Sequence, residues 1–454
     1  MPAPASRAIR GMAGGAGYAP PADLTPPLPP GVTLRAIDGG AAYYAANGFT
    51  DAVSGGWDDL SFFPVASDYS FYPSHDPAVF QSLGLNFSTR VTSDASLPAL
   101  RAAGIAVVNG GDTVTGLGSE TVGWNIDEPG DWATITGAAA TFAGYGGTGR
   151  FLHVNFTWNQ FVYGGIGDPC GGSDDQMTDT VSCETGMPAS LPHINLVSAD
   201  IYWFAGSTGD ALPHQCALIY GLGSDATADQ MARGSNYGDM IDQMRGWLIT
   251  YPAPCGAYIE TEDALFGPPD REILPQEWNW AVWSQIVHGA RWILNFGTTS
   301  NFGSQATFGF SETVLSGASV SMFDQATATN ALIADLAPVI NSPFALGYAS
   351  VTPAGYTFPV AHLVLDNGIE VMAKYYTGGT YSNSAGTFHN GFYVFACVRG
   401  SAAQTGITAT FTTTGGYSGP VTVMNESRTV TASGGVFTDT FATAYDVHIY
   451  QMGG

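Results

Sequence analysis

Residues 255–297, CGAYIETEDALFGPPDREILPQEWNWAVWSQIVHGARWILNFG, carry the pattern that decides the fold. Two short strand-like runs, CGAYIE at 255–260 and RWILNFG at 291–297, flank the stretch PQEWNWAVWSQIVHGA at 275–290. The apolar residues of the middle stretch recur at helical spacing. A strand, a helix and a strand in this order predict two parallel strands joined by a crossover helix.

The same alternation extends outward from this unit over roughly residues 60–300. Helix-compatible stretches, such as 76–84, 97–104 and 237–251, separate the strand-like runs. Eight parallel strands that close on themselves form a (β/α)8 barrel, also called a TIM barrel. The expected strands lie at 61–67, 86–91, 105–110, 121–127, 150–156, 195–203, 255–260 and 291–297.

The pattern changes after a further expected helix at 328–340. From there, Thr, Val, Tyr and Phe alternate with other residues, Gly, Asn and Pro mark turns, and no helical period appears. This pattern predicts an all-β sandwich with strands at 361–368, 369–376, 391–400, 407–413, 420–425 and 444–452. The chain therefore divides into a Pro/Gly/Ala-rich N-terminal arm (1–40), a barrel domain (41–339) and a sandwich domain (340–454).

Composition excludes several classes of function. The formal net charge is −25 and Lys374 is the only lysine, which opposes binding of nucleic acid. We find no apolar run long enough for a membrane span, so no membrane insertion is expected. Residues 1–31 contain two Arg but no continuous apolar segment, so we expect a flexible or extended arm and no clear secretory signal peptide.

The five cysteines show no CxxC spacing. Cys170 and Cys183 bracket a Gly/Asp-rich loop that a disulfide would restrain, with two unpaired thiols as the alternative. Cys216 and Cys255 are a second candidate pair. Cys397 lies in a strand-like run and is expected to be a small buried residue.

Metal ligands are not grouped in any familiar pattern. The eight His form no HExxH motif, and Asp174, Asp175 and Asp179 lack the regular spacing of a calcium-binding loop. His153 and His288 are expected to be structural. We therefore expect neither a metal nor a cofactor.

Acidic residues follow two of the expected barrel strands. Strand 121–127 ends in Asp127 and Glu128, just before Pro129, and strand 255–260 ends in Glu260. The C-terminal ends of barrel strands build the active site of this fold, and these two strands are nearly opposite each other. Glu262 is the alternative to Glu260, because residues two apart in a strand share a face.

These segments resemble clan A of the glycoside hydrolases, over roughly residues 55–300. GWNIDEP at 123–129 is similar to the Asn-Glu-Pro motif of strand four in that clan, and 258–263 with 276–297 is similar to its strand-seven to strand-eight segment. The resemblance implies Glu128 as general acid/base and Glu260 as nucleophile, with Tyr202 contacting the nucleophile. Asp127 departs from the usual Asn, so the hydrogen bond to the sugar 2-hydroxyl would come from a residue that accepts rather than donates unless it is protonated.

Several residues on or near strand ends are candidates for binding sugar, because aromatic rings stack on sugar faces and amides bond hydroxyls. Tyr202 and Trp203 face opposite sides of a strand, so at most one of them lines the mouth unless the strand has ended. Each aromatic residue also has a structural alternative in the core. The candidates are Asp127, Asn155, Trp158, Tyr202, Trp203, Glu262 and Asn295.

Two hypotheses of function follow. The first is a retaining glycoside hydrolase that cleaves a surface or cell-wall polysaccharide with two carboxylates and no cofactor. The second is a non-catalytic glycan-binding or structural protein, such as a bacteriophage minor tail protein, whose N-terminal arm docks on other tail proteins. Both imply a carbohydrate partner and an extracellular or virion location.

Overall fold

The computed structural model describes residues 28–36, 39–46, 57–67, 77–89, 96–109, 118–129, 132–144, 150–156, 161, 194–204, 212–247, 253–261, 272–296, 309–361 and 363–453. Trp158, Glu262, Cys170, Cys183 and the Asp174–Asp179 loop fall outside these ranges.

The first domain is a closed barrel of eight parallel strands, as predicted. Each observed strand lies within an expected run, and β5 and β8 have the predicted bounds. The strands are β2 (Val65–Ser67), β3 (Phe87–Ser88), β4 (Ala106–Asn109), β5 (Thr121–Asp127), β6 (Phe151–Phe156), β7 (Leu196–Ala199), β8 (Cys255–Glu260) and β9 (Ile293–Phe296).

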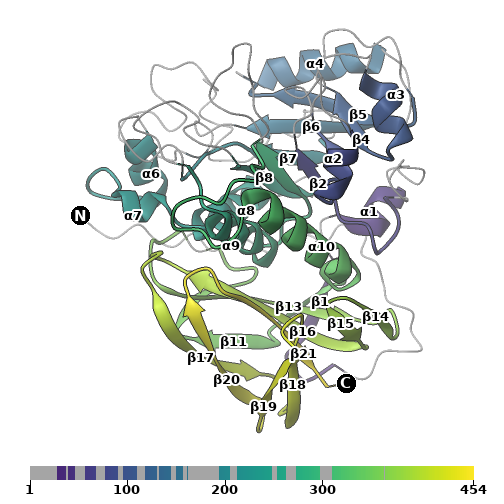
Figure 1. The fold of residues 1–454 in the computed structure, drawn as a ribbon. Coiled ribbons are helices and arrows are strands. Elements are labelled where there is room, and N and C mark those ends of the chain that lie inside the picture. The colour runs from purple at the N-terminus through teal and green to yellow at the C-terminus, as the bar shows by residue number, and fades with distance from the viewer. Residues whose placement is uncertain are drawn as a thin grey trace.

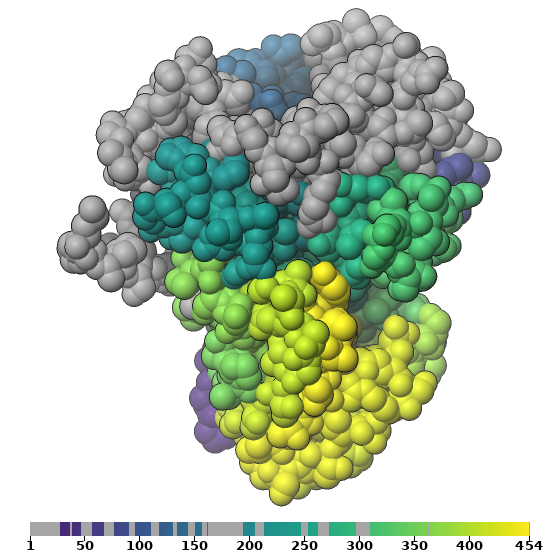
Figure 2. Space-filling model, turned by 60° about the vertical axis from the view of Figure 1, so that its left-hand side comes forward, coloured from purple at the N-terminus to yellow at the C-terminus, as the bar shows by residue number. Residues whose placement is uncertain are grey.

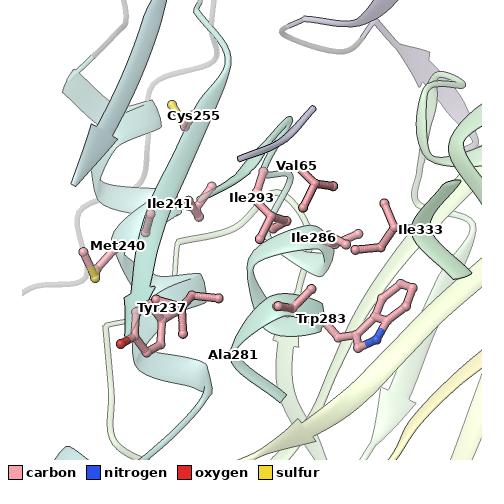
Figure 3. Close-up of a cluster of buried hydrophobic side chains, with 14 of the residues drawn as sticks. Val65, Tyr237, Met240, Ile241, Cys255, Ala281, Trp283, Ile286, Ile293 and Ile333 are labelled. Carbon is pink, nitrogen blue, oxygen red and sulfur yellow. The ribbon is translucent and has the colours of Figure 1, made fainter. Parts of the chain in front are cut away.

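Helices surround the barrel and follow most of its strands (Figure 1). Figure 3 shows the layer between strands and helices, where Val65 and Ile293 from the barrel face Ile286 of α9 and Ile333 of α10. The described helices are α1 (Gly40–Ala46), α2 (Pro77–Ser82), α3 (Leu97–Ala102), α4 (Trp132–Gly144), α6 (Leu212–Tyr220), α7 (Ala228–Met231), α8 (Ser235–Trp247), α9 (Pro275–Val287) and α10 (Met322–Ile340). None of them is long and apolar enough to cross a bilayer.

Aromatic side chains close the N-terminal end of the barrel. Tyr44 of α1 and Trp57 pack edge-on at 5.0 Å between ring centroids, and Trp57 contacts Phe87 and Phe151 at 5.2 and 5.1 Å. Phe87 and Phe151 begin strands β3 and β6. Because this end is filled, the mouth of the barrel lies at the opposite, C-terminal end of the strands.

The second domain contains two sheets, whose strands pair antiparallel except for β12 and β13. The larger has the order β1-β10-β13-β16-β21-β18-β19, with β12 beside β13, and the smaller has the order β11-β17-β20. A hairpin of β14 and β15 is added. The strands are β1 (Thr33–Arg35), β10 (Phe344–Leu346), β11 (Ala349–Thr352), β12 (Ala354–Thr357), β13 (Gly368–Tyr376), β14 (Tyr381–Asn383), β15 (Gly386–Phe388), β16 (Gly391–Arg399), β17 (Thr405–Thr413), β18 (Gly419–Val423), β19 (Arg428–Ala432), β20 (Val436–Thr443) and β21 (Val447–Met452).

Parts of the sandwich domain differ from the sequence-based expectations. Within the expected N-terminal arm, Thr33–Arg35 form β1, which pairs with β10 at the edge of the larger sheet. The strand expected at 361–368 is wrong, since residues 363–367 form no ladder. Arg399 holds this segment instead, because its guanidinium donates to the Val364 carbonyl at 2.6 Å and to Asp366 Oδ1 at 2.8 Å.

The larger sheet is buried on both faces. Along β13, Val371 and Tyr375 pack in the core between the two sheets, whereas Glu370, Met372 and Lys374 belong to the opposite face. That opposite face packs on α9 and α10 of the barrel. Figures 1 and 2 show the two domains stacked directly on each other, with α8, α9 and α10 at the junction.

The described cysteines are all buried thiols. The predicted Cys216–Cys255 disulfide is therefore wrong, because both residues are free. Cys216 lies on α6 and Cys255 starts β8, so each fills core space as a small apolar side chain. Cys397 is buried in β16, as predicted.

Candidate active site

Glu128 follows directly after β5 at the barrel mouth, where its side chain is exposed. Its backbone adopts the left-handed conformation with φ of 43°, which is uncommon for a residue with a side chain. The Glu128 N–H donates to the Asn155 carbonyl at 3.0 Å, which extends the β5–β6 ladder by one bond. Strain of this kind at a strand end is frequent in functional sites.

Glu260 ends β8 and is fully buried. Residues of β8 alternate, so Tyr258 and Glu260 face the barrel interior while Ile259 packs toward the helices. The Phe204 N–H donates to Glu260 Oε1 at 2.6 Å, and the Tyr237 hydroxyl of α8 donates to Oε2. Two donors on two oxygens fix the orientation of this carboxylate and stabilise its charge.

Tyr237 contacts Glu260, which is the contact that the sequence resemblance implied for Tyr202. Its hydroxyl also accepts the Trp203 N–H at 3.3 Å, which ties the donor to the loop after β7. The ring of Tyr202 packs on Phe296 at 5.2 Å between ring centroids. Burial and the neighbouring Asp200 raise the pKa of Tyr202 well above its usual value, so its hydroxyl stays protonated.

Asn155 links the carboxyl groups on neighbouring strands. Its Nδ2 donates to Asp127 Oδ1 at 2.9 Å and to Asp200 Oδ2 at 3.1 Å, and its Oδ1 accepts from the Ser198 hydroxyl at 2.7 Å. His153 lies 2.8 Å from Ser198 Oγ, and burial lowers the pKa of His153 to about 3. The imidazole is therefore neutral and acts as part of the scaffold, in line with the structural role expected for it.

Asp200 is a site residue that the sequence reasoning missed. It follows β7 on the same face as Leu196 and Ser198, so strand alternation alone would have placed it at the mouth. Asp200 and Glu128 are joined by a side-chain hydrogen bond. Burial, followed by the charges of Glu128 and Asp127, raises the pKa of Asp200 well above its usual value.

Three tryptophan and asparagine side chains lie away from the mouth. Trp203 is buried and donates through Nε1 to Met240 Sδ at 3.0 Å, so its predicted role in sugar binding is replaced by a role in the core. Asn295 faces α9, where its amide accepts from Trp278 at 2.8 Å and donates to the Ala66 carbonyl at 2.9 Å. Trp124 stacks on Phe142 of α4 outside the barrel.

The expectation for Asn295 fails because Asn295 alternates with Phe296 in β9, and Phe296 is the one that faces the interior. Trp203 lies beyond the end of β7 at Ala199, and its ring belongs to the core that also contains Tyr237 and Met240. A position shifted by one residue in a strand points to the opposite face. The sugar-binding candidates that the structure brings to the mouth are Asp127, Asn155 and Tyr202.

A second polar cluster lies between the two domains, on the helices that face the sandwich. We call it the interdomain charge network. Asp239, Asp242 and His288 have ligand atoms close enough together to hold a cation. However, His288 already bonds Asp242 and Glu370 with its two ring nitrogens, and both oxygens of Asp239 accept from Arg399. The network consists of Asp239, Asp242, Arg245, His288, Glu370 and Arg399, and these ion pairs leave no need for a metal.

The mouth therefore combines carboxyl groups in two different environments. Glu260 is buried, and the Phe204 N–H and the Tyr237 hydroxyl that donate to its two oxygens favour the ionised form. Glu128 is exposed beside a carboxyl group, Asp200, whose pKa is raised. Such a pair can supply both a nucleophile and a proton donor.

Comparisons with known proteins show similarity only at the level of fold. No family model matches the chain, and no curated protein matches it. Among solved structures, one titled AmyP in complex with maltose has 10% identity and a TM-score of 0.42, with 90% of this chain and 97% of that chain covered.

Two further solved structures have comparable values. An Anoxybacillus alpha-amylase has 8% identity and a TM-score of 0.37, with 86% of this chain and 98% of the other covered. A glycoside hydrolase family 5 protein from Bacteroides vulgatus has 9% identity and a TM-score of 0.40, with 86% and 88% covered. At these values the similarity says nothing about the substrate of this chain.

Proposed function

We propose that this chain is a retaining glycoside hydrolase with Glu128 as general acid/base and Glu260 as nucleophile. The observation that carries the proposal is the contrast between two glutamates at the ends of β5 and β8. Glu260 is buried and held by the Phe204 N–H and the Tyr237 hydroxyl, whereas Glu128 is exposed and hydrogen-bonded to another carboxyl group. Glycosidic cleavage needs one ionised and one protonated carboxyl group.

The reaction would proceed in two displacements. In the first, a Glu260 oxygen attacks the anomeric carbon while Glu128 gives its proton to the leaving oxygen, and the glycosidic C–O bond breaks. The sugar is then bound to Glu260 as an ester. In the second, Glu128 takes a proton from water, the water oxygen attacks the anomeric carbon, and Glu260 leaves as a carboxylate. The product keeps the anomeric configuration of the substrate.

Aromatic and polar groups of the barrel mouth are of the kinds that bind sugar rings. The rings of Tyr202 and Phe296 are packed together at the mouth and offer an apolar surface for sugar C–H groups. Asp127 is exposed at the end of β5 and offers its carboxylate to sugar hydroxyl groups, and Asn155 of β6 holds that carboxylate through Nδ2. Asp127 accepts hydrogen bonds when ionised, so a hydroxyl that donates is the suitable partner.

A neutral or weakly charged surface or cell-wall polysaccharide is the proposed substrate class. The mouth carries Asp127, Glu128 and Asp200 in addition to Glu260, and the whole chain has a formal net charge of −25. A strongly anionic glycan would be repelled by this field. Binding without cleavage, as in an adhesion protein, is the alternative outcome that the test below separates.

The test measures release of reducing sugar from plant and bacterial cell-wall polysaccharides and from aryl glycosides. Wild type is compared with Glu128→Gln and Glu260→Gln, and with Glu312→Gln as a control that changes an exposed glutamate of the described chain. We expect turnover to be lost in both mouth variants and retained in the control.

The variants should still fold and bind glycan, because Gln is nearly isosteric with Glu. Turnover that survives Glu260→Gln would contradict the role of this residue. Tight glycan binding by a wild type that cleaves nothing would contradict the enzyme and favour adhesion.

A further inference from the structure

Asp200 and Glu128 come from different strand ends yet their carboxyl groups are hydrogen-bonded. Asp200 follows β7 and Glu128 follows β5, and Asn155 of the intervening β6 donates to Asp200 Oδ2 and to Asp127 Oδ1. Asn155 thus holds Asp200 beside the end of β5. This arrangement is built from three consecutive strands of the barrel.

A hydrogen bond between two carboxyl groups requires a proton, because ionised carboxylates only accept. Asp200 Oδ1 is enclosed and has no donor beside it among the described residues. If Asp200 were ionised, this oxygen would be a buried acceptor without a partner, which is costly. A proton on the pair removes that cost.

We propose that Glu128 and Asp200 share one proton at neutral pH and act as a single acid/base pair, with Asp200 as a positioning residue that works through Glu128. The proton lies on Asp200 in the resting site, where burial raises the pKa of Asp200. The catalytic consequence rests on the function proposed above. The shared proton itself does not depend on that function.

The pair affects both displacements. When Glu128 gives the shared proton to the leaving oxygen, two carboxylates remain side by side near Asp127, which is unfavourable. The pair therefore holds its proton to a higher pH than an isolated carboxyl group would, and it becomes a stronger base for the water of the second step. Among the described residues, Asn155 and the protonated Tyr202 also lie near Asp200, and neither carries a positive charge that would compensate it.

The first test observes the proton without any substrate. We would titrate wild type with carbon-13-labelled carboxyl groups by NMR and assign the Asp200 signal from Asp200→Asn. We expect Asp200 to be protonated at neutral pH in wild type and to ionise at lower pH in Glu128→Gln, whose amide donates to the Asp200 carboxylate. Ionisation of wild-type Asp200 in the ordinary range near pH ~3.9 would overturn the proposal.

The second test compares pH profiles of turnover. Asp200→Asn removes one charge and places an amide donor beside Glu128, so both effects favour loss of the Glu128 proton. The alkaline limb should move to lower pH by about one unit or more. Asp127→Asn is the matched control, because it removes a carboxylate from the same mouth that is bonded to Asn155 and raises the pKa of Asp200 by charge alone.

A shift in Asp200→Asn that is clearly larger than in Asp127→Asn supports the shared proton. Equal shifts would overturn it and leave only a general charge effect. The two proposals can fail separately. A protonated Asp200 in a protein without turnover would refute the glycosidase function and support the shared proton. Turnover by a protein whose Asp200 is ionised would refute the shared proton and support the glycosidase function.

Discussion

Asp242 is the residue whose substitution tests the interdomain charge network most sharply. Its buried carboxylate accepts from Arg245 Nη1 at 2.7 Å, from the Tyr356 hydroxyl at 3.0 Å and from His288 Nδ1 at 3.0 Å. Asp242→Asn keeps the shape but removes the charge and turns an amide N–H toward donors. Breaking one partner of a buried ion pair costs about 3–5 kcal/mol, and we expect a loss of that size in the free energy of unfolding.

The network also predicts how stability depends on pH. Burial alone would lower the pKa of His288, but the Asp242 and Glu370 carboxylates raise it from 6.5 to about 9. The folded state thus binds this proton more tightly than the unfolded state. The stabilisation is complete below pH 6.5 and is lost as the pH rises through 9. A shift of this size corresponds to roughly 3 kcal/mol.

A matched control separates the effect of burial from the effect of the His–carboxylate interaction itself. His214 and Asp225 form a second His–carboxylate contact, also 3.0 Å long, but both side chains are about two-thirds exposed, at 65% and 68%. Exposed pairs contribute less than about 1 kcal/mol. Asp225→Asn should therefore change stability little, although it removes the same type of interaction.

The assay is urea unfolding followed by tryptophan fluorescence from about pH 6 to about pH 10, a range that includes the titration of His288. Wild type should lose stability through the upper half of this range, and Asp242→Asn should show a much weaker dependence. If Asp242→Asn and Asp225→Asn cost the same within about 1 kcal/mol, the buried network does not stabilise the junction of the two domains and the reasoning is refuted.

Three further substitutions distinguish residues of the hydrophobic core from residues of the barrel mouth. Trp203→Ala removes the packing and the bond to Met240, so unfolding should become easier by about 3–5 kcal/mol, and an unchanged melting temperature would contradict its place in the core. Tyr202→Ala should instead lower kcat/KM strongly and change the free energy of unfolding little. A large loss in the free energy of unfolding with little change in kcat/KM would place Tyr202 in the core. Tyr237→Phe removes a donor to the Glu260 carboxylate, so kcat/KM should fall about ten- to one hundredfold, whereas unchanged kinetics would show that this bond does not serve the reaction.

The barrel was predictable from sequence because its strands are short apolar runs separated by helical periods. CGAYIE and TVGWNID mark β8 and β5 with their observed bounds. In the sandwich, β19 and β20 were not expected, although RTVTA and VFTDTFAT alternate in the way a half-exposed strand does. The segment at 361–368 begins with an apolar run, but residues 363–367 form no ladder, and the Arg399 guanidinium bonds the Val364 carbonyl and the Asp366 side chain.

The candidate site was predictable only where strand ends define it. Glu128 and Glu260 follow from their positions after β5 and β8. Tyr237 could not be found this way, because it reaches Glu260 from α8, an element with no local sequence relation to β8. Asp200 was predictable in principle, since it directly follows β7 and continues the face of that strand that carries Ser198.

The central claim is that Glu260 attacks the anomeric carbon and forms a covalent glycosyl-enzyme. The most direct measurement is proton NMR of the first product released from a glycoside that wild type cleaves, recorded before the free sugar equilibrates between its anomers. The account predicts a product with the anomeric configuration of the substrate. A product with inverted configuration would mean that water attacks directly, and would contradict the role of Glu260 as nucleophile.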